Sequence, residues 1–392
     1  MIAEVGASTA RERLPVSWFE LFYDLVLVAA LVSINSAFLD HPTAVNAATA
    51  ASAAAALFGI WLLTTLIGNR FPADGMPQRL LLRGQVACSV VAALAVDQHE
   101  GLRNEYGLIA FGLALLLTAA ALVWQERAWR AGSGLPARVD DRVVLIAIVV
   151  AALVAFVATD LTDTWRWVAI VTATAIAVSP AVARWPNARP PIEPRHLGER
   201  MGLFVLMVLG LSFGQLVMDL TGSDSIPDLR FFLLMFVLMF VLWWMYFGLE
   251  LSEQPHRVGR PSWIAAHYLL LIGIVALGDV MSALSAARGA GELVDGAAYL
   301  GFALASSLAG FAMLVLAEDR LGSAAAVLLV GLAVVALTYD VVVDVTDSQD
   351  LRLTALVSAA FLVVAAIALG TLARRHGTRA AEMTSRNPRQ SD

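Results

Sequence analysis

The chain has 392 residues, of which 59% are hydrophobic and only 15% are charged. A water-soluble domain carries roughly 45–50% apolar and about 25% charged residues, so water could not cover this much apolar surface, and lipid is the expected solvent. All 26 basic residues are arginine and the formal net charge is only -6. The absence of lysine excludes a Walker A phosphate loop and a lysine Schiff base, and we expect no nucleic-acid partner.

Apolar stretches long enough to cross a membrane recur along the whole chain. A hydrocarbon core about 30 Å thick needs about 20 helical residues. This length predicts about twelve transmembrane helices, at residues 18–39, 44–68, 79–98, 105–126, 142–159, 165–183, 199–219, 229–251, 263–286, 295–317, 323–341 and 352–373. The expected fold class is therefore all-α, a polytopic transmembrane helix bundle whose first partner is the lipid bilayer.

The arginines predict the direction of these helices, because the cytoplasmic loops of membrane proteins retain basic residues. When both termini are placed in the cytoplasm, 21 of the 26 arginines fall on the cytoplasmic side and five on the other. We therefore expect a bacterial, multi-pass protein of the inner (cytoplasmic) membrane with cytoplasmic N- and C-termini.

The chain divides into two halves that resemble each other. ELFYDLVLVAALVS at 20–33 and ERMGLFVLMVLGLS at 199–212 both begin with glutamate and end with serine, and a proline-rich linker separates the halves. Six spans in each half keep both in the same orientation, which predicts a parallel repeat about an axis near the membrane normal. The expected parts are a cytoplasmic N-terminal tail (1–17), a first half (18–183), a cytoplasmic linker (184–198), a second half (199–373) and a cytoplasmic disordered tail (374–392).

Three segments carry a likeness to a known family: WFELFYDLVLV at 18–28, HLGERMGLFVLMVLG at 196–210 and HYLLLIGIVAL at 267–277. The first is the most specific, because two acidic residues four positions apart are rare in a spanning helix. Over about residues 14 to 375 the chain resembles the bacterial low temperature requirement A (LtrA) family. The resemblance implies a multi-span membrane protein linked by name to growth in the cold, and it carries over no catalytic or binding residue. The family usually has L-G-E-S where this chain has LGLS at 209–212, so no carboxylate role is implied there.

Two carboxylates in the first span form the leading candidate site. Glu20 and Asp24 lie one helical turn apart on the same face, where charge in lipid costs at least about 2.5–3.5 kcal/mol. Because they repel each other, a nearby arginine or a shared proton is expected. Arg200, next to Glu199 at the matching depth of the seventh span, is the preferred partner, and Arg83 is the second. The group is either a structural ion cluster that joins the halves or a proton- or cation-coupled site.

Other ionisable side chains lie in the spans. Asp279 is followed by further helix and is the best single candidate for a buried functional carboxylate, whereas Asp97 precedes a loop and is expected to be exposed. The two aspartates are separated by 182 residues, as are Trp61 and Trp243, which supports the repeat. His267 is expected to be a hydrogen-bonded packing histidine, with a proton relay or pH sensor as the alternative.

Uncharged polar and small residues complete the candidates. Asn35 in the first span and Ser212 and Gln215 in the seventh are expected either to form interhelical hydrogen bonds or to line a polar pathway. Gly210 and Gly214 are expected to permit close helix approach or local unwinding. The alanine-rich start of the second span predicts close packing, or else plain filler.

These features favour a secondary transporter or permease for an unknown small solute, with proton or cation coupling. We expect no catalytic residue, cofactor or metal site, because neither metal-ligand spacing nor a nucleophilic motif is present, and we therefore do not expect an enzyme. An oligomeric cation channel, assembled as a homo-oligomer, is the first alternative, because the predicted outer loops are acidic. A non-transporting membrane sensor or scaffold that supports growth in the cold is the second.

Overall fold

The computed structural model describes residues 17–40, 44–71, 75–95, 101–133, 139–184, 191–221, 229–248, 261–286, 299–318 and 322–346, with isolated positions between 360 and 370. All regular structure within these residues is helical. The helices are α1 (Trp18–Asp40), α2 (Ala44–Arg70), α3 (Met76–Leu94), α4 (Gly101–Ser133), α5 (Val139–Val157), the 3-10 turn η1 (Ala158–Asp160), α6 (Asp163–Ala183), α7 (Pro194–Thr221), α8 (Leu229–Phe247), α9 (Pro261–Ala286), α10 (Leu300–Glu318) and α11 (Gly322–Thr346).

The first eleven predicted spans each correspond to one of these helices. Helix α4 extends further at both ends than the predicted span, and α7 begins at Pro194, inside the predicted linker. Proline suits the first position of a helix, because its fixed φ is helical and its missing N–H would have no intrahelical partner there. The twelfth predicted span, at 352–373, and both predicted tails lie outside the described residues, apart from Ser17 and the isolated positions.

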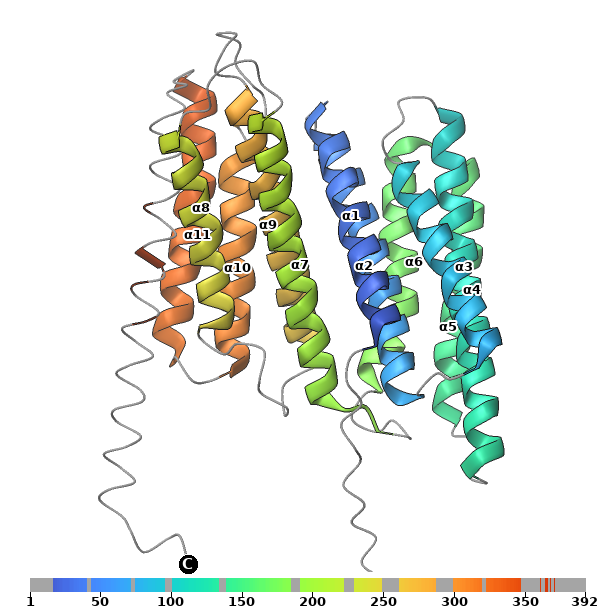
Figure 1. The fold of residues 1–392 in the computed structure, drawn as a ribbon. Helices are drawn as coiled ribbons and strands as arrows, with labels where there is room; N and C mark the ends of the chain where they lie inside the picture. The colour runs from blue at the N-terminus through green and yellow to red at the C-terminus, as the bar shows by residue number, and fades with distance from the viewer. Residues whose placement is uncertain are drawn as a thin grey trace, which may run out of the picture.

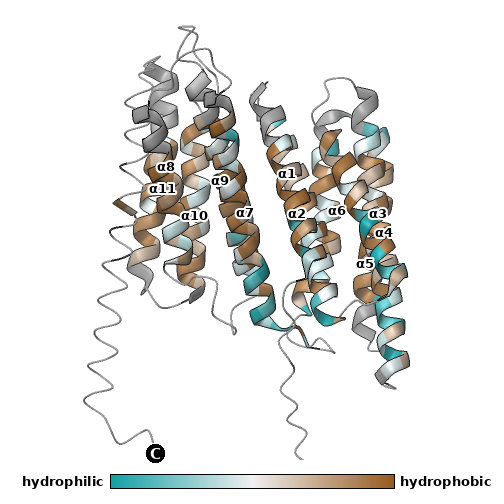
Figure 2. Cartoon of the chain, viewed as in Figure 1, coloured by the Kyte–Doolittle hydropathy of each residue, from teal (hydrophilic) through white to brown (hydrophobic). Residues whose placement is uncertain are grey.

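Seven helices in the described part of the chain are long and apolar enough to cross a membrane. They lie at Val45–Arg70, Glu105–Gly132, Arg142–Asp160, Trp165–Ala183, Pro194–Gln215, Pro261–Met281 and Leu300–Ala317. Apolar residues dominate the middle of the bundle, and hydrophilic residues gather toward the lower ends of α4 and α7 (Figure 2). Large apolar side chains also cover the outer surface, as at Ile146, Leu153 and Val157 of α5, each more than half exposed. In water such a surface would be unfavourable, and in lipid it is the expected one.

The helices form two groups that meet along α1 and α7. Helices α1–α6 lie on one side of the view and α7–α11 on the other, with α1 and α7 facing each other at the centre (Figure 1). In the first group α1 contacts α2 and α3, α3 contacts α4, and α4 contacts α5. In the second group α7 contacts α8 and α9, α9 contacts α10, and α10 contacts α11. The same order of contacts thus recurs six helices later.

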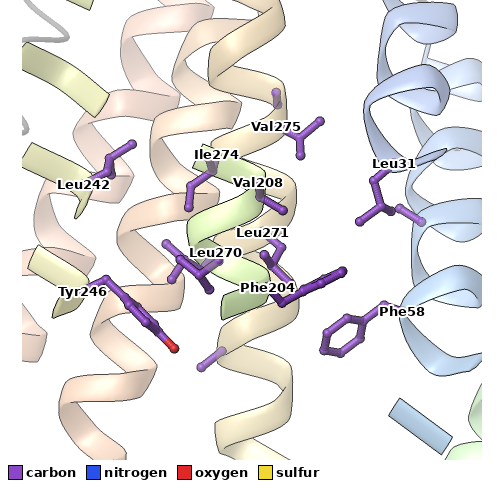
Figure 3. Close-up of a cluster of buried hydrophobic side chains, with 14 of the residues drawn as sticks. Leu31, Phe58, Phe204, Val208, Leu242, Tyr246, Leu270, Leu271, Ile274 and Val275 are labelled. Carbon is purple, nitrogen blue, oxygen red and sulfur yellow. The ribbon is translucent and has the colours of Figure 1, made fainter. Parts of the chain in front are cut away.

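Most buried apolar side chains of the described residues belong to two large clusters. One lies within the first group, where alanines of α5 and α6, among them Ala151 and Ala173, allow the helices to pack closely. The larger cluster extends across both groups. Leu31 and Phe58 from the first group approach Phe204 from the second within it (Figure 3). The interface between the groups is therefore part of the apolar core.

Candidate functional site

A cluster of charged side chains lies where α1 meets α7, near the N-terminal ends of both helices. Asp24 is fully buried and Arg200 is almost so. Arg200 Nη2 donates to Asp24 Oδ1 at 2.5 Å, and Nη1 donates to Glu20 Oε1 at 3.4 Å. The structure thus pairs both carboxylates with Arg200, the partner that we preferred from the sequence. Arg83, which we ranked second, is exposed on α3.

Trp61 of α2 completes the surroundings of Asp24. Its indole Nε1 donates to the same Oδ1 at 2.6 Å, and its ring is stacked on Phe204 with centroids 4.7 Å apart. The Arg200 guanidinium lies 5.6 Å from the Trp61 ring centroid, in the range of a cation–π contact. Three helices therefore converge on one carboxylate. From the sequence, Trp61 was noted only because another tryptophan, Trp243, follows it 182 residues later. The available signal was that a buried indole N–H needs an acceptor.

Glu20 is held in place by the start of its own helix. The Ser17 backbone N–H donates to Glu20 Oε2 at 2.8 Å, and the Glu20 N–H donates to Ser17 Oγ at 3.2 Å. This reciprocal pair is a capping box, which satisfies two backbone N–H groups at the helix start. The other oxygen, Oε1, is then directed at Arg200 and at His196, whose Nε2 lies 3.6 Å away. His196 is a further member of the cluster that the sequence did not single out.

The cluster carries more negative than positive charge when His196 is neutral, because it holds two carboxylates and one guanidinium. Within the described residues no hydrogen bond reaches Asp24 Oδ2 or Arg200 Nε, although both atoms are buried. Buried polar atoms without partners are rare, and they mark places where a proton, water or ion could bind.

Of three other predicted residues, only the Glu199 side chain is described, and it lies outside this cluster. Glu199 is exposed and forms an ion pair with Arg195 one turn away, with Nε and Oε1 separated by 3.2 Å. Asp97 lies outside the described residues. Asn35 lies in α1, but its side chain is outside the described part of the structure.

Asp279 and Ser212 are buried where α7 and α9 come closest. A Cβ added at Gly278 would lie 2.6 Å from Ser212 Cβ, so the two helices nearly touch there. Among the described residues, a Cβ added at Gly210 or Gly214 would meet nothing within 4 Å, so these residues show no close approach there. Each glycine is two residues from Ser212, about 200° around the helix, and so lies on the other side of α7. The α7 helix is also unbroken through both positions.

His267 is fully buried between α8 and α9. Its Nδ1 lies 2.8 Å from the Trp263 carbonyl oxygen, which can only accept, so Nδ1 carries the proton. Its Nε2 lies 2.9 Å from the Tyr246 hydroxyl, which then donates. Both ring nitrogens are engaged, as in a hydrogen-bonded packing histidine. Gln215, the remaining candidate, lies on α7 three residues beyond Ser212 and is half-buried.

A cavity of about 280 Å³ lies between α1, α2, α9 and the start of α10. The wall from α2 consists of small side chains followed by one ring: Ala47, Ala50, Ala51, Ala54 and Phe58. The predicted close packing of this alanine-rich segment therefore does not occur on this face, where the small side chains leave space instead. No charged residue lines the cavity within the described part of the chain.

The cavity and the charged cluster are neighbours along the same helices. Phe58, which lines the cavity, is stacked on Trp61, which binds Asp24, with ring centroids 5.6 Å apart. Leu31, on the opposite wall, is seven residues beyond Asp24, about two turns along α1. Asp24, Arg200 and Asp279 are not among the lining residues. The carboxylates therefore flank the cavity rather than surround it.

A bundle of long apolar helices with an apolar outer surface and buried charges only at helix contacts defines a multi-pass helical membrane protein. Residues 15–374 match the family described as bacterial low temperature requirement A protein (LtrA), and the chain belongs to this family. The chain is also similar to an uncharacterized protein of Rhizobium meliloti (strain 1021), at 25% identity over 272 residues. That alignment covers 66% of this chain and 64% of the relative, slightly less than two thirds of its length.

Proposed function

We propose that this protein is a secondary transporter or permease of the bacterial inner membrane, and not an enzyme. The observation that carries the proposal is the cavity of about 280 Å³ at the contact between the two groups of helices. Carriers built from two repeats bind their solute at the interface between the repeats, near the middle of the membrane. Movement of one group against the other would then open the cavity to alternate sides.

The proposed architecture is twelve spans in two parallel halves, 18–183 and 199–373, with both termini in the cytoplasm. The recurring order of helix contacts in α1–α5 and α7–α11 supports it. The parallel direction of α1 and α7 supports it too, because Glu20 and Arg200 meet at the N-terminal ends of both helices. An inverted repeat would bring opposite ends together.

The charged cluster is suited to coupling transport to protons or cations. It bridges the two groups, since Glu20 and Asp24 belong to α1 and Arg200 to α7. Binding of a proton or cation would neutralise its excess negative charge and so change the strength of this bridge. A change in the bridge would alter the balance between arrangements of the two groups, which is how a coupling ion acts.

The test uses proteoliposomes with pyranine trapped inside, under an imposed proton gradient or sodium gradient. Amino acids, sugars, nucleosides and uncharged hydrocarbons are added singly; pyranine records proton movement, and ion-selective dyes in parallel vesicles record sodium and potassium movement. A carrier gives saturable, solute-dependent proton movement that Asp24→Asn abolishes. The matched control is Glu199→Gln, which also removes one carboxylate but from an exposed pair, and which should transport normally.

The alternatives give different results in the same vesicles. A sodium or potassium flux that needs no solute and does not saturate would indicate the oligomeric cation channel. Folded protein without any flux in either gradient would indicate the sensor or scaffold and would overturn the proposal.

A further inference from the structure

The described residues that line the cavity are unfavourable for charged and strongly polar ligands. It is formed by alanine, leucine, isoleucine, valine and phenylalanine side chains, and by two tyrosines, Tyr268 and Tyr299. The Tyr268 hydroxyl already donates to the Ala51 carbonyl oxygen at 2.6 Å. A polar group that entered would lose its hydration and find few partners, which is unfavourable.

The size and the apolar lining of the cavity favour an apolar occupant over water. A buried water needs two to four polar partners, and an apolar cavity of about 150 Å³ in another protein stays dry and binds benzene. The present cavity, at about 280 Å³, is larger than that one. In an empty space of this size the lining side chains have no van der Waals contacts on the side that faces the cavity, so an apolar occupant would be favoured.

The cavity exists because of side-chain size on one face of α2. Ala47, Ala50, Ala51 and Ala54 follow a helical spacing of three and four residues, so they share that face. Ala50 and Ala54 are both buried, so larger side chains there would occupy the space. On the opposite side, Phe302 lines the cavity and is 44% exposed, so the cavity reaches the surface of the bundle beside α10.

We infer that this cavity is a binding site for an uncharged apolar molecule of the size of a short hydrocarbon chain. Two sources share this chemistry, a free hydrocarbon solute and the acyl chain of a bilayer lipid entering past Phe302. That the bound molecule is also the transported solute rests on the proposed function. Binding itself does not depend on transport.

The test is photolabelling of the full chain in lipid nanodiscs with two probes. One is dodecane that carries a diazirine, and the other is phosphatidylcholine with a diazirine in one acyl chain. Labelled residues are located by mass spectrometry. The site predicts label on α2 between Ala47 and Phe58 and on α9 between Tyr268 and Val280, removed by an excess of unlabelled dodecane. Label from the dodecane probe alone identifies a free solute, and label from the lipid probe identifies an acyl chain.

The variant for this test is the double substitution Ala50→Leu and Ala54→Leu, which fills the cavity. Its labelling at α2 and α9 should fall at least about tenfold, which corresponds to about 1.4 kcal/mol of binding free energy. The control is Ala29→Leu with Ala175→Leu, which adds the same side chains at two exposed positions of α1 and α6. Its labelling should match that of the wild type.

The site would be overturned if the label were confined to lipid-facing helices. It would also be overturned if unlabelled dodecane did not reduce the label at α2 and α9. The competition in wild-type protein decides this even if the double variant does not fold. If dodecane reduces the labelling but the pyranine vesicles show no flux, the binding site stands and the proposed transporter function is wrong. If a polar solute gives flux but dodecane does not reduce the labelling, the transporter function stands and this binding site is wrong.

Discussion

The contact between the two groups of helices contains two regions of opposite character. Near the N-terminal ends of α1 and α7, Asp24, Arg200 and Trp61 are buried, tightly packed and joined by short hydrogen bonds. About two turns further along α1, between Leu31 and Ile34, the interface opens into the apolar cavity. One region joins the helices through directional contacts, and the other leaves space between them.

This difference indicates where the structure is restrained and where it can adapt. A buried ion pair adds little net stability compared with apolar packing, but removal of one partner leaves a buried charge and is strongly destabilising. The cluster therefore fixes how α1 meets α7. The cavity wall is held mainly by nondirectional apolar contacts, so it can repack around a ligand at lower cost.

The largest effect is expected for Arg200→Ala. The substitution leaves Asp24 without a counter-charge and Glu20 with only His196, so unfolding should become easier by about 3–5 kcal/mol. The measurement is chemical or thermal unfolding of the purified protein, followed by tryptophan fluorescence. Arg195→Ala is the control, because the Arg195–Glu199 pair is exposed, and such pairs contribute roughly 0.2–1 kcal/mol. Equal effects of the two substitutions would show that the cluster does not hold the groups together.

A smaller loss is expected for Trp61→Phe. Phenylalanine preserves the stacking on Phe204 but removes the donor to Asp24. Hydrogen bonds to charged groups contribute about 1.5–3 kcal/mol, so the stability should fall by about this amount. The control is Trp243→Phe, because Trp243 is partly exposed and stacks on Phe240. A larger loss at Trp243 would contradict the special role of the indole N–H at Trp61.

The helices and the charged pair were predictable because lipid imposes strong rules. Each span must be long, apolar and internally hydrogen-bonded, which makes its position visible in the sequence. Charges in lipid are so unfavourable that Glu20 and Asp24 predicted a nearby arginine or a shared proton, and the matching depth of the seventh span favoured Arg200.

The side-chain geometry was not predictable, because hydropathy does not show which face of an apolar helix meets its neighbour. Helix α2 is apolar on nearly all sides, so nothing in its pattern directs Trp61 toward Asp24. Whether its alanines bring helices together or leave a cavity depends on the residues opposite, such as Leu31 and Val275. For the same reason, the sequence did not show that α7 and α9 approach each other closely at Gly278.

The smallest effect is expected at the cavity wall, for Tyr268→Phe. The substitution removes the hydrogen bond to the Ala51 carbonyl oxygen but keeps the ring against Phe58, so the loss should be about 0.5–1.5 kcal/mol. Because the wall also becomes more apolar, competed dodecane labelling at α2 and α9 should be retained or increased. Tyr106→Phe on the exposed face of α4 is the control for both measurements. A loss as large as that of Arg200→Ala would mean that the cavity wall is as rigidly held as the charged cluster. The contrast between the two regions would then be wrong, because both would serve to fix the helices in one arrangement.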